Sequence, residues 1–220
     1  MQKRRFDHRM EEKVAFNIEA WNPKTLVGQA VKRGQITTIE QIFDQGKPIK
    51  EVEIVDALLP DLENKVIEIA SVQRMTKNNR KAKFRATVVI GDRHGHVGIG
   101  VGKEVEVRPA IEGAIKDAKR NIISINFGCG SWECSCGTPH SLPLTLRAKV
   151  GTSEILLKPA PRGVGVVAGV TARSVLELAG LKDVWTFSKG RTKDIYNMSM
   201  ATYYALAGLS KIKNAEALKV

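Results

Sequence analysis

The sequence predicts an α+β protein in which two small sheet-and-helix units follow a short helical extension. Up to about residue 60 the apolar residues recur at helical spacing, whereas from Val66 they alternate, which is the spacing of strands. Strands followed by a helix occur again after an insert rich in Cys and His. The predicted boundaries are 1–63 for the extension with its basic N-terminal arm, 64–127 for the first unit, 128–141 for the insert and 142–220 for the second unit.

Charge narrows the classes of partner. The chain has 220 residues, 35 Lys and Arg against 23 Asp and Glu, and a formal net charge of +12. A chain that is also 43% hydrophobic should fold, and one this basic is expected to bind a polyanion, either nucleic acid or an anionic membrane surface. We find no apolar run of about 18 residues that would span a membrane, and no signal peptide, so a cytoplasmic location is expected.

Three short helices are predicted in the extension. The first has Asn22 as its N-cap, Pro23 at the first helical position and Gly34 as its stop. The second begins at a capping box formed by Thr37 and Glu40 and ends at Gly46, and the third is ended by Pro60. None of them carries residues suited to chemistry, so we expect them to pack against another surface.

The first unit is predicted to contain three strands and a helix. Strands at 66–76 and 83–92 are joined by a turn, a third lies at 97–102, and a helix starts near Val107. In the second strand one face is formed by Phe84, Ala86, Val88 and Ile90. One helix face is formed by Ile111, Ala114, Ile115, Ala118 and Ile122. A three-stranded sheet backed by a helix is the general plan of a double-stranded-RNA-binding domain, which uses shape and phosphate contacts.

The turn between the first two strands is exposed and basic. Its residues are Lys77, Asn78, Asn79, Arg80, Lys81 and Lys83. No acid balances these cations. The turn formers in the middle predict a hairpin tip, and phosphate contact is favoured over a loop that is basic only for solubility.

A run of alternating glycines raises the question of nucleotide binding. Gly98, Gly100 and Gly102 alternate with β-branched residues and are followed by Lys103. A Walker loop needs Gly five positions before Gly102 and a hydroxyl after the lysine, but Val97 and Glu104 stand there. The spacing is that of a strand with one bare face, which marks close approach of another backbone. That neighbour can be a packed helix or strand, RNA phosphates flanked by Arg93, His94, His96 and Lys103, or both.

The second unit is predicted as β-β-α-β-α. Two strands are joined by Gly151 and Thr152, a helix is stopped by Gly180, and a short strand precedes a final helix. Arg162 lies among Gly and Pro before the first of these helices, which favours an anion site. Its glycine spacing misses the dinucleotide-binding pattern by one residue. A second basic turn contains Lys189, Arg191 and Lys193.

Several segments resemble the universal small-ribosomal-subunit protein five family. They are VVIGDRHGHVGIGVGKEVEVRPAIEGAIKDAKRN in the first unit and PAPRGVGVVAG, LELAGLKDVW and SKGRTKDIYNMSMATYYAL in the second. The resemblance extends from about Leu62 to Leu209, and the long N-terminal region and PHSLP stretch are similar to the archaeal type. It implies a double-stranded-RNA-binding-like domain followed by the family's second domain, which contains a left-handed βαβ crossover.

The resemblance also implies function. Such a protein binds small-subunit ribosomal RNA, contacts ribosomal proteins four and eight, lines the mRNA entry path and affects decoding accuracy. By position, the segment from Arg74 to Lys83 matches the family's RNA-reaching hairpin, Asp92 to Lys103 its glycine-rich RNA-facing strand, and Arg162 its Pro-Arg-Gly motif.

The insert is a candidate zinc site. Cys129, Cys134, Cys136 and His140 follow the spacing C-x4-C-x-C-x3-H, and three thiolates with one imidazole form a standard tetrahedral zinc set. The odd number of cysteines, crowded into one segment, argues against a disulfide framework. The alternative is three reduced cysteines beside a histidine that contacts RNA phosphate. A catalytic cysteine is disfavoured, because no orienting group is evident.

The favoured function is a structural RNA-binding ribosomal protein without catalytic residues, membrane contact or small-molecule substrate. The alternatives are a nucleotide-using enzyme built on the glycine segments, and an RNA chaperone or helicase component, which would need an NTPase core. The predicted RNA contacts are Arg74, Lys77, Asn78, Asn79, Arg80, Lys81, Lys83, Arg85, Arg93, His94, His96, Gly98, Gly100, Gly102, Lys103, Arg162, Lys189, Arg191 and Lys193.

Overall fold

The computed structural model describes residues 21–210, so the predicted N-terminal basic arm lies outside the described residues. The helices are α1 Leu26–Lys32, α2 Ile39–Asp44, α3 Val52–Leu58, α4 Val107–Arg120, α5 Val170–Ala179 and α6 Ile195–Ser210. The strands are β1 Glu63–Met75, β2 Arg80–Gly91, β3 His96–Glu104, β4 Ile122–Ser124, β5 Leu146–Val150, β6 Ser153–Pro159, β7 Val166–Val167 and β8 Val184–Lys189. No helix within 21–210 is long and apolar enough to cross a membrane.

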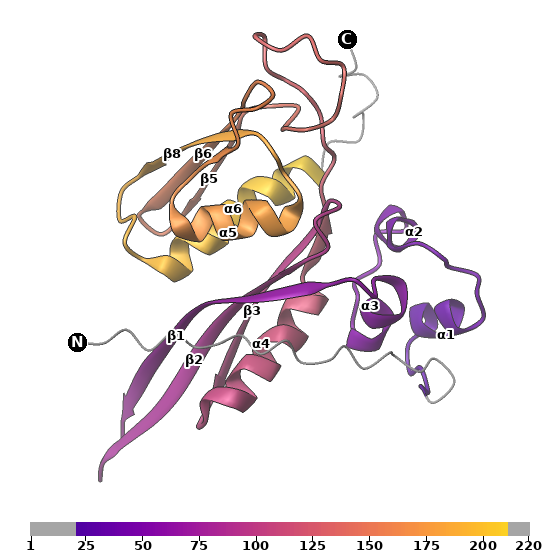
Figure 1. The fold of residues 1–220 in the computed structure, drawn as a ribbon. Coiled ribbons are helices and arrows are strands. Elements are labelled where there is room, and N and C mark those ends of the chain that lie inside the picture. The colour runs from indigo at the N-terminus through magenta and orange to yellow at the C-terminus, as the bar shows by residue number, and fades with distance from the viewer. Residues whose placement is uncertain (1–20, 211–220) are drawn as a thin grey trace.

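The predicted α+β class is confirmed, and the elements stack in layers (Figure 1). The sheet that contains β5, β6 and β8 lies against α5 and α6, which in turn lie against the sheet of β1, β2 and β3. Helix α4 covers the opposite face of that first sheet, and α1 to α3 stand beside α4. The first sheet is therefore covered by helices on both faces.

The N-terminal helices begin later than predicted. Helix α1 is capped by Thr25, whose hydroxyl accepts a hydrogen bond from the Gly28 amide at 3.1 Å, and not by Asn22. The amides of Lys24 and Thr25 donate to the Glu51 carboxylate, which holds this segment in a non-helical conformation. The predicted capping box is also wrong, since the N-cap of α2 is Thr38 and its side chain makes no capping bond. As expected, these helices pack, with Ile42, Ile54 and Val55 fully buried.

The first sheet is antiparallel throughout, in the order β1-β2-β3-β4. The predicted face of Phe84, Ala86, Val88 and Ile90 is confirmed as part of the core under α4. Helix α4 ends at Arg120, so Ile122 does not belong to it as predicted; it lies in β4, a three-residue strand that pairs with His96–Gly98. Strand β4 is too short to carry a periodic signal.

The second sheet has the order β5-β6-β8-β7. Strands β7 and β8 are parallel and are connected through α5, as a βαβ unit requires. The sequence missed β7, which has only two residues. Helix α5 ends at Gly180, whose φ of 89° gives the predicted stop. The left-handed crossover stays a prediction.

The two units share one core. Val89, Val97 and Ile99 of the first sheet pack in the same buried cluster as Leu176 and Leu206 of the second unit. Backbone bonds join them too, because the Arg93 amide donates to the Leu178 carbonyl at 3.0 Å. The two units are thus fixed against each other, and surfaces on both belong to one rigid body.

Candidate nucleic-acid interface and metal centre

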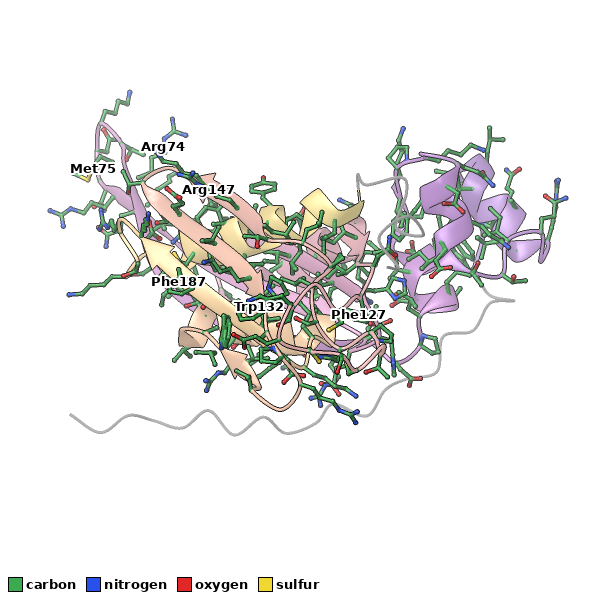
Figure 2. All side chains as sticks on the ribbon, turned by 90° about the horizontal axis from the view of Figure 1, so that it is seen from above. Arg74, Met75, Phe127, Trp132, Arg147 and Phe187 are labelled. Atoms are coloured by element: carbon green, nitrogen blue, oxygen red, sulfur yellow. The ribbon has the colours of Figure 1, made fainter. Side chains whose placement is uncertain are left out.

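The long β1–β2 hairpin carries the exposed cations that the sequence predicted. The turn is closed by the Thr76 amide, which donates to the Asn79 carbonyl at 2.8 Å, and by the Asn79 amide, which donates to the Thr76 hydroxyl at 3.2 Å. The predicted RNA contacts of this hairpin are all exposed: Arg74, Lys77, Asn78, Asn79, Arg80, Lys81 and Lys83. Figure 2 shows the tip, with Arg74 and Met75, extending from the body of the protein.

Electrostatics at this tip favours an external anion. Arg74 and Lys81 are direct cross-strand partners, and like charges placed opposite each other destabilise a strand pair. Within residues 21–210 none of the hairpin's Lys or Arg residues from Arg74 to Lys83 forms a salt bridge. A phosphate backbone alongside the tip would remove this repulsion.

The bare glycine face of β3 is occupied by α4. A Cβ on Gly98 would overlap the Ala118 carbonyl, one on Gly100 the Ala118 amide, and one on Gly102 the Ala110 carbonyl. All three glycines are buried. The prediction that RNA phosphates lie along this face is therefore wrong, and the packing alternative holds. Lys103 is exposed at the end of the strand, so its contact with RNA stays a prediction.

The loop before β3 is fixed within the protein. The Asp92 carboxylate accepts hydrogen bonds from the His94 amide at 2.7 Å and the His96 amide at 3.0 Å, and lies 2.5 Å from His96 Nδ1. Burial raises the pKa of Asp92, but the His96 ring and these amides outweigh it, so the pKa lies below its usual value. His96 Nε2 is buried and has no hydrogen-bond partner among residues 21–210. His96 therefore cannot contact RNA as predicted, whereas the exposed His94 can.

Two predicted arginines are already paired. Arg93 contacts Glu63 at 2.8 Å, which neutralises its charge although the side chain is exposed. Arg85 is half-buried; it contacts Glu68 at 3.4 Å and stacks over the Tyr196 ring, 5.1 Å from its centroid. Arg85 thus joins the first sheet to α6 and is already engaged within the protein, so the structure does not support its predicted contact with RNA.

The loop around Arg162 differs from the predicted anion site. Gly163 and Gly165 adopt positive φ angles of 94° and 74°, and their amides donate to Asp183 Oδ1 at 3.0 and 2.8 Å. These two amides are thus not free for an external anion, whereas the Arg162 side chain is exposed, so its contact with RNA stays a prediction. Lys189, Arg191 and Lys193 on the second basic turn are also exposed.

The predicted metal ligands come together. The ligand atoms of Cys129, Cys134, Cys136 and His140 all lie within 4.8 Å of one another. The Cys129 and Cys136 sulfurs are 3.6 Å apart, and Cys134 Sγ is 3.6 Å from His140 Nε2. Zinc bonds of about 2.0 to 2.3 Å place tetrahedral ligand atoms roughly 3.3 to 3.8 Å apart. The four residues therefore fit a tetrahedral zinc ion with little movement.

The thiols of this cluster compete for ionisation. Thr138 and the neighbouring thiols lower the pKa of Cys136 to about 6. Burial and the hydrogen bond to Cys136 raise the pKa of Cys129 to about 11. The two sulfurs therefore titrate as an interacting pair, in which one thiol ionises more readily than the other. A divalent cation would stabilise both thiolates at once.

A buried carboxylate orients the histidine of the cluster. Asp183 Oδ2 lies 2.8 Å from His140 Nδ1, which directs Nε2 toward the sulfurs. The His140 side chain is only 6% exposed, so the alternative in which it contacts RNA phosphate is wrong. Sequence reasoning gave Asp183 no role, because 43 positions separate it from His140 and no local pattern marks it.

The second sheet has an exposed surface that the sequence analysis did not identify. Lys158 stacks over the Phe187 ring, 5.1 Å from its centroid, and Arg147 contacts Glu154 at 2.6 Å nearby. Figure 2 shows Arg147 of β5 and Phe187 of β8. The alternation of charged and apolar residues along 146–158 is the signal that could have found this face.

The chain is similar to known ribosomal proteins over most of its length. Residues 62–126 match the family described as "Ribosomal protein S5, N-terminal domain", and residues 148–219 match "Ribosomal protein S5, C-terminal domain". "Small ribosomal subunit protein uS5" of Methanocaldococcus jannaschii is 57% identical over 201 residues, which cover 91% of this chain and 93% of that protein. The protein of the same name from Aeropyrum pernix is 54% identical over 190 residues, covering 86% and 87%. The chain therefore belongs to the ribosomal protein S5 family.

Proposed function

We propose that this protein is a structural, RNA-binding component of the small ribosomal subunit, located in the cytoplasm and without enzymatic turnover. The observation that carries the proposal is the hairpin whose cations form no salt bridge within residues 21–210, in a chain whose relatives are named as small-subunit proteins. The contacts that the structure leaves available are Arg74, Lys77, Asn78, Asn79, Arg80, Lys81, Lys83, His94, Lys103, Arg162, Lys189, Arg191 and Lys193.

The partners follow from the family resemblance. They are small-subunit ribosomal RNA, ribosomal proteins four and eight, and mRNA near its entry path. The core that the two units share supports the proposal of a folded RNA partner. It fixes the distance between the hairpin and the loop that carries Arg162, and such a fixed distance suits an RNA that is itself folded.

A nucleotide-using enzyme is not supported by this arrangement. The β3 glycines lie inside a strand beneath α4, so no phosphate can reach their amides. The Gly163 and Gly165 amides already donate to the Asp183 carboxylate, so they are not available to cradle the phosphates of a nucleotide.

Salt dependence tests the RNA-binding proposal. We expect the affinity for small-subunit RNA fragments to fall steeply as salt rises, with a log–log slope of about −0.7 to −0.9 for each phosphate contact. A slope close to zero between 50 and 200 mM salt (roughly the range over which such contacts weaken) would contradict phosphate recognition.

The insert is proposed to hold one zinc ion through Cys129, Cys134, Cys136 and His140. The convergence of the four ligand atoms and the orienting hydrogen bond from His140 to Asp183 support it. The metal would be structural, because it has four protein ligands and no open position. Elemental mass spectrometry should find one zinc per chain, lost in Cys134→Ser. A metal-free chain with three titratable thiols would refute the assignment.

A further inference from the structure

Asp183 is a buried carboxylate that serves two different segments. The residue is 4% exposed, and within residues 21–210 no Lys or Arg is paired with it. Burying a charge in this way is costly unless each oxygen has its own donor. Both oxygens do, but the donors come from the Cys/His insert and from the loop that carries Arg162.

The first oxygen determines which histidine nitrogen can bind a metal. Because Asp183 Oδ2 is 2.8 Å from His140 Nδ1, the ring carries its proton on Nδ1 and presents the Nε2 lone pair to the cysteines. The carboxylate thus selects the tautomer that can coordinate a metal ion.

The second oxygen holds the loop. Gly163 and Gly165 have positive φ angles, and a Cβ on either would meet nothing within 4 Å, so these two residues are not held by side-chain packing of their own. The Gly163 and Gly165 amides are bonded to Asp183 Oδ1, and the Gly165 carbonyl accepts from the Val184 amide at 3.2 Å. Arg162 projects from this loop.

A third set of bonds joins the same segments. The Ser141 hydroxyl donates to the Asp183 carbonyl and accepts from the Ala160 amide at 3.2 Å. The His140 carbonyl accepts from the Lys182 and Asp183 amides at 3.2 and 3.3 Å. The end of the insert, the start of the Arg162 loop and the start of β8 therefore form one buried polar network.

We propose that Asp183 is a positioning residue that couples the metal centre to the Arg162 loop, so that metal occupancy fixes this loop in its anion-binding arrangement. The proposal rests on the zinc assignment above. A metal ion on Nε2 makes the Nδ1 proton more acidic, which strengthens its bond to Asp183 and immobilises the carboxylate. If the metal raises the affinity of the Arg162 loop for an anion, then by linkage an anion bound at Arg162 raises the affinity for the metal by the same factor.

Asp183→Asn tests the metal side. Asparagine keeps the shape and can still accept from Gly163 and Gly165, but it turns an NH2 group toward His140 Nδ1. The ring must then carry its proton on Nε2, which cannot bind a metal. We expect zinc affinity, measured by competition with a chromophoric chelator, to fall by about 10- to 100-fold.

Asp92→Asn is the matched control. It makes the same change beside His96, in a pair that does not belong to the Cys/His cluster, and should leave zinc affinity within about twofold of wild type, a difference of about 0.4 kcal/mol. Cooperative thermal unfolding of Asp183→Asn confirms that it folds. Unchanged zinc affinity in the folded Asp183→Asn chain would overturn the proposal.

Hydrogen exchange tests the loop side in the unmutated chain. Removing zinc with a chelator should speed exchange of the Gly163 and Gly165 amides by about tenfold, the loss of roughly 1.4 kcal/mol of protection. Amides of the β2–β3 pairing near Val89 and Ile99 are the internal control and should not change. If zinc is bound and its removal leaves the two glycines unaffected, the coupling is wrong while the zinc site stands. If the chain binds no zinc, the coupling and the zinc assignment fall together, and RNA binding by the hairpin is still tested independently.

Discussion

The two glycine-rich segments look alike in the sequence but do opposite things in the structure. In β3, Gly98, Gly100 and Gly102 have ordinary extended backbones and no room for a side chain, because α4 lies against them. In the loop before α5, Gly163 and Gly165 have open space around them and backbones of positive φ. The first segment needs glycine for what surrounds it, and the second needs glycine for its own conformation.

This difference decides which segment can face RNA. A strand whose bare face is filled by a helix contributes to stability and offers no surface to a ligand. A loop held by hydrogen bonds to a buried carboxylate can present Arg162 to an anion. Substitutions in the two segments should therefore have different consequences.

The largest effect is expected from Gly100→Val. Its Cβ alone would overlap backbone atoms of Ala114 and Ala118, so the helix must move away from the sheet. We expect the free energy of unfolding, measured by chemical denaturation, to fall by about 4 kcal/mol or more. Loss of RNA affinity without loss of stability would instead place this glycine at an RNA contact.

The next effect is expected from removing three hairpin cations. Changing Lys77, Arg80 and Lys81 together to Ala should weaken binding to small-subunit RNA at least about tenfold, or 1.4 kcal/mol, with stability unchanged. The control removes an equal charge from exposed lysines of the helical extension, Lys24, Lys47 and Lys50. If both triple variants weaken binding equally, net charge and not the hairpin governs affinity.

A smaller effect is expected in the second glycine segment. Gly163→Ala forces an alanine into a left-handed backbone and should cost about 1 kcal/mol. Gly113→Ala is the matched control, because Gly113 lies inside α4, has no positive φ, and an added Cβ there would meet only the Gly102 Cα at 3.9 Å. It should not lower the free energy of unfolding, because alanine is the better helix former. Equal costs at both positions would refute the conformational explanation.

The smallest effect concerns the joint between the two units. The Tyr203 hydroxyl of α6 donates to the Asn121 carbonyl at 2.8 Å, and Tyr203→Phe should lower the free energy of unfolding by about 0.5 kcal/mol at neutral pH.

Tyr203 also predicts a pH dependence. Burial, with smaller effects of Tyr204 and Asp117, raises the pKa of Tyr203 to about 12 from an ordinary value of 10.0. The neutral form is therefore favoured in the folded protein, and its stabilising effect, complete below pH 10.0, is lost as the pH rises toward about 12. The free energy of unfolding of Tyr203→Phe should therefore lack this alkaline loss of stability. Tyr204→Phe, which changes an exposed tyrosine, should still show it. If the free energy of unfolding falls equally with rising alkaline pH in wild type and Tyr203→Phe, the role given to Tyr203 is wrong.

The sequence was informative where structure is local. Alternation identified the buried face of β2, Gly180 ended α5, and four ligands within twelve positions predicted the Cys/His cluster. The sequence was not sufficient where contacts between residues far apart in the chain determine the local structure. The amides before α1 bond to Glu51, Arg85 pairs with Glu68 and Tyr196, and the short strands β4 and β7 form only through pairing. Asp183 could not be found because its partners lie far away in the chain.

The most direct test of the account is protein–RNA crosslinking in small ribosomal subunits that contain this chain, with the crosslinked peptides mapped by mass spectrometry. The account predicts crosslinks in the hairpin from Arg74 to Lys83 and at Arg162, and none between Val97 and Gly102. Crosslinks to the β3 glycines, with the hairpin uncrosslinked, would contradict it.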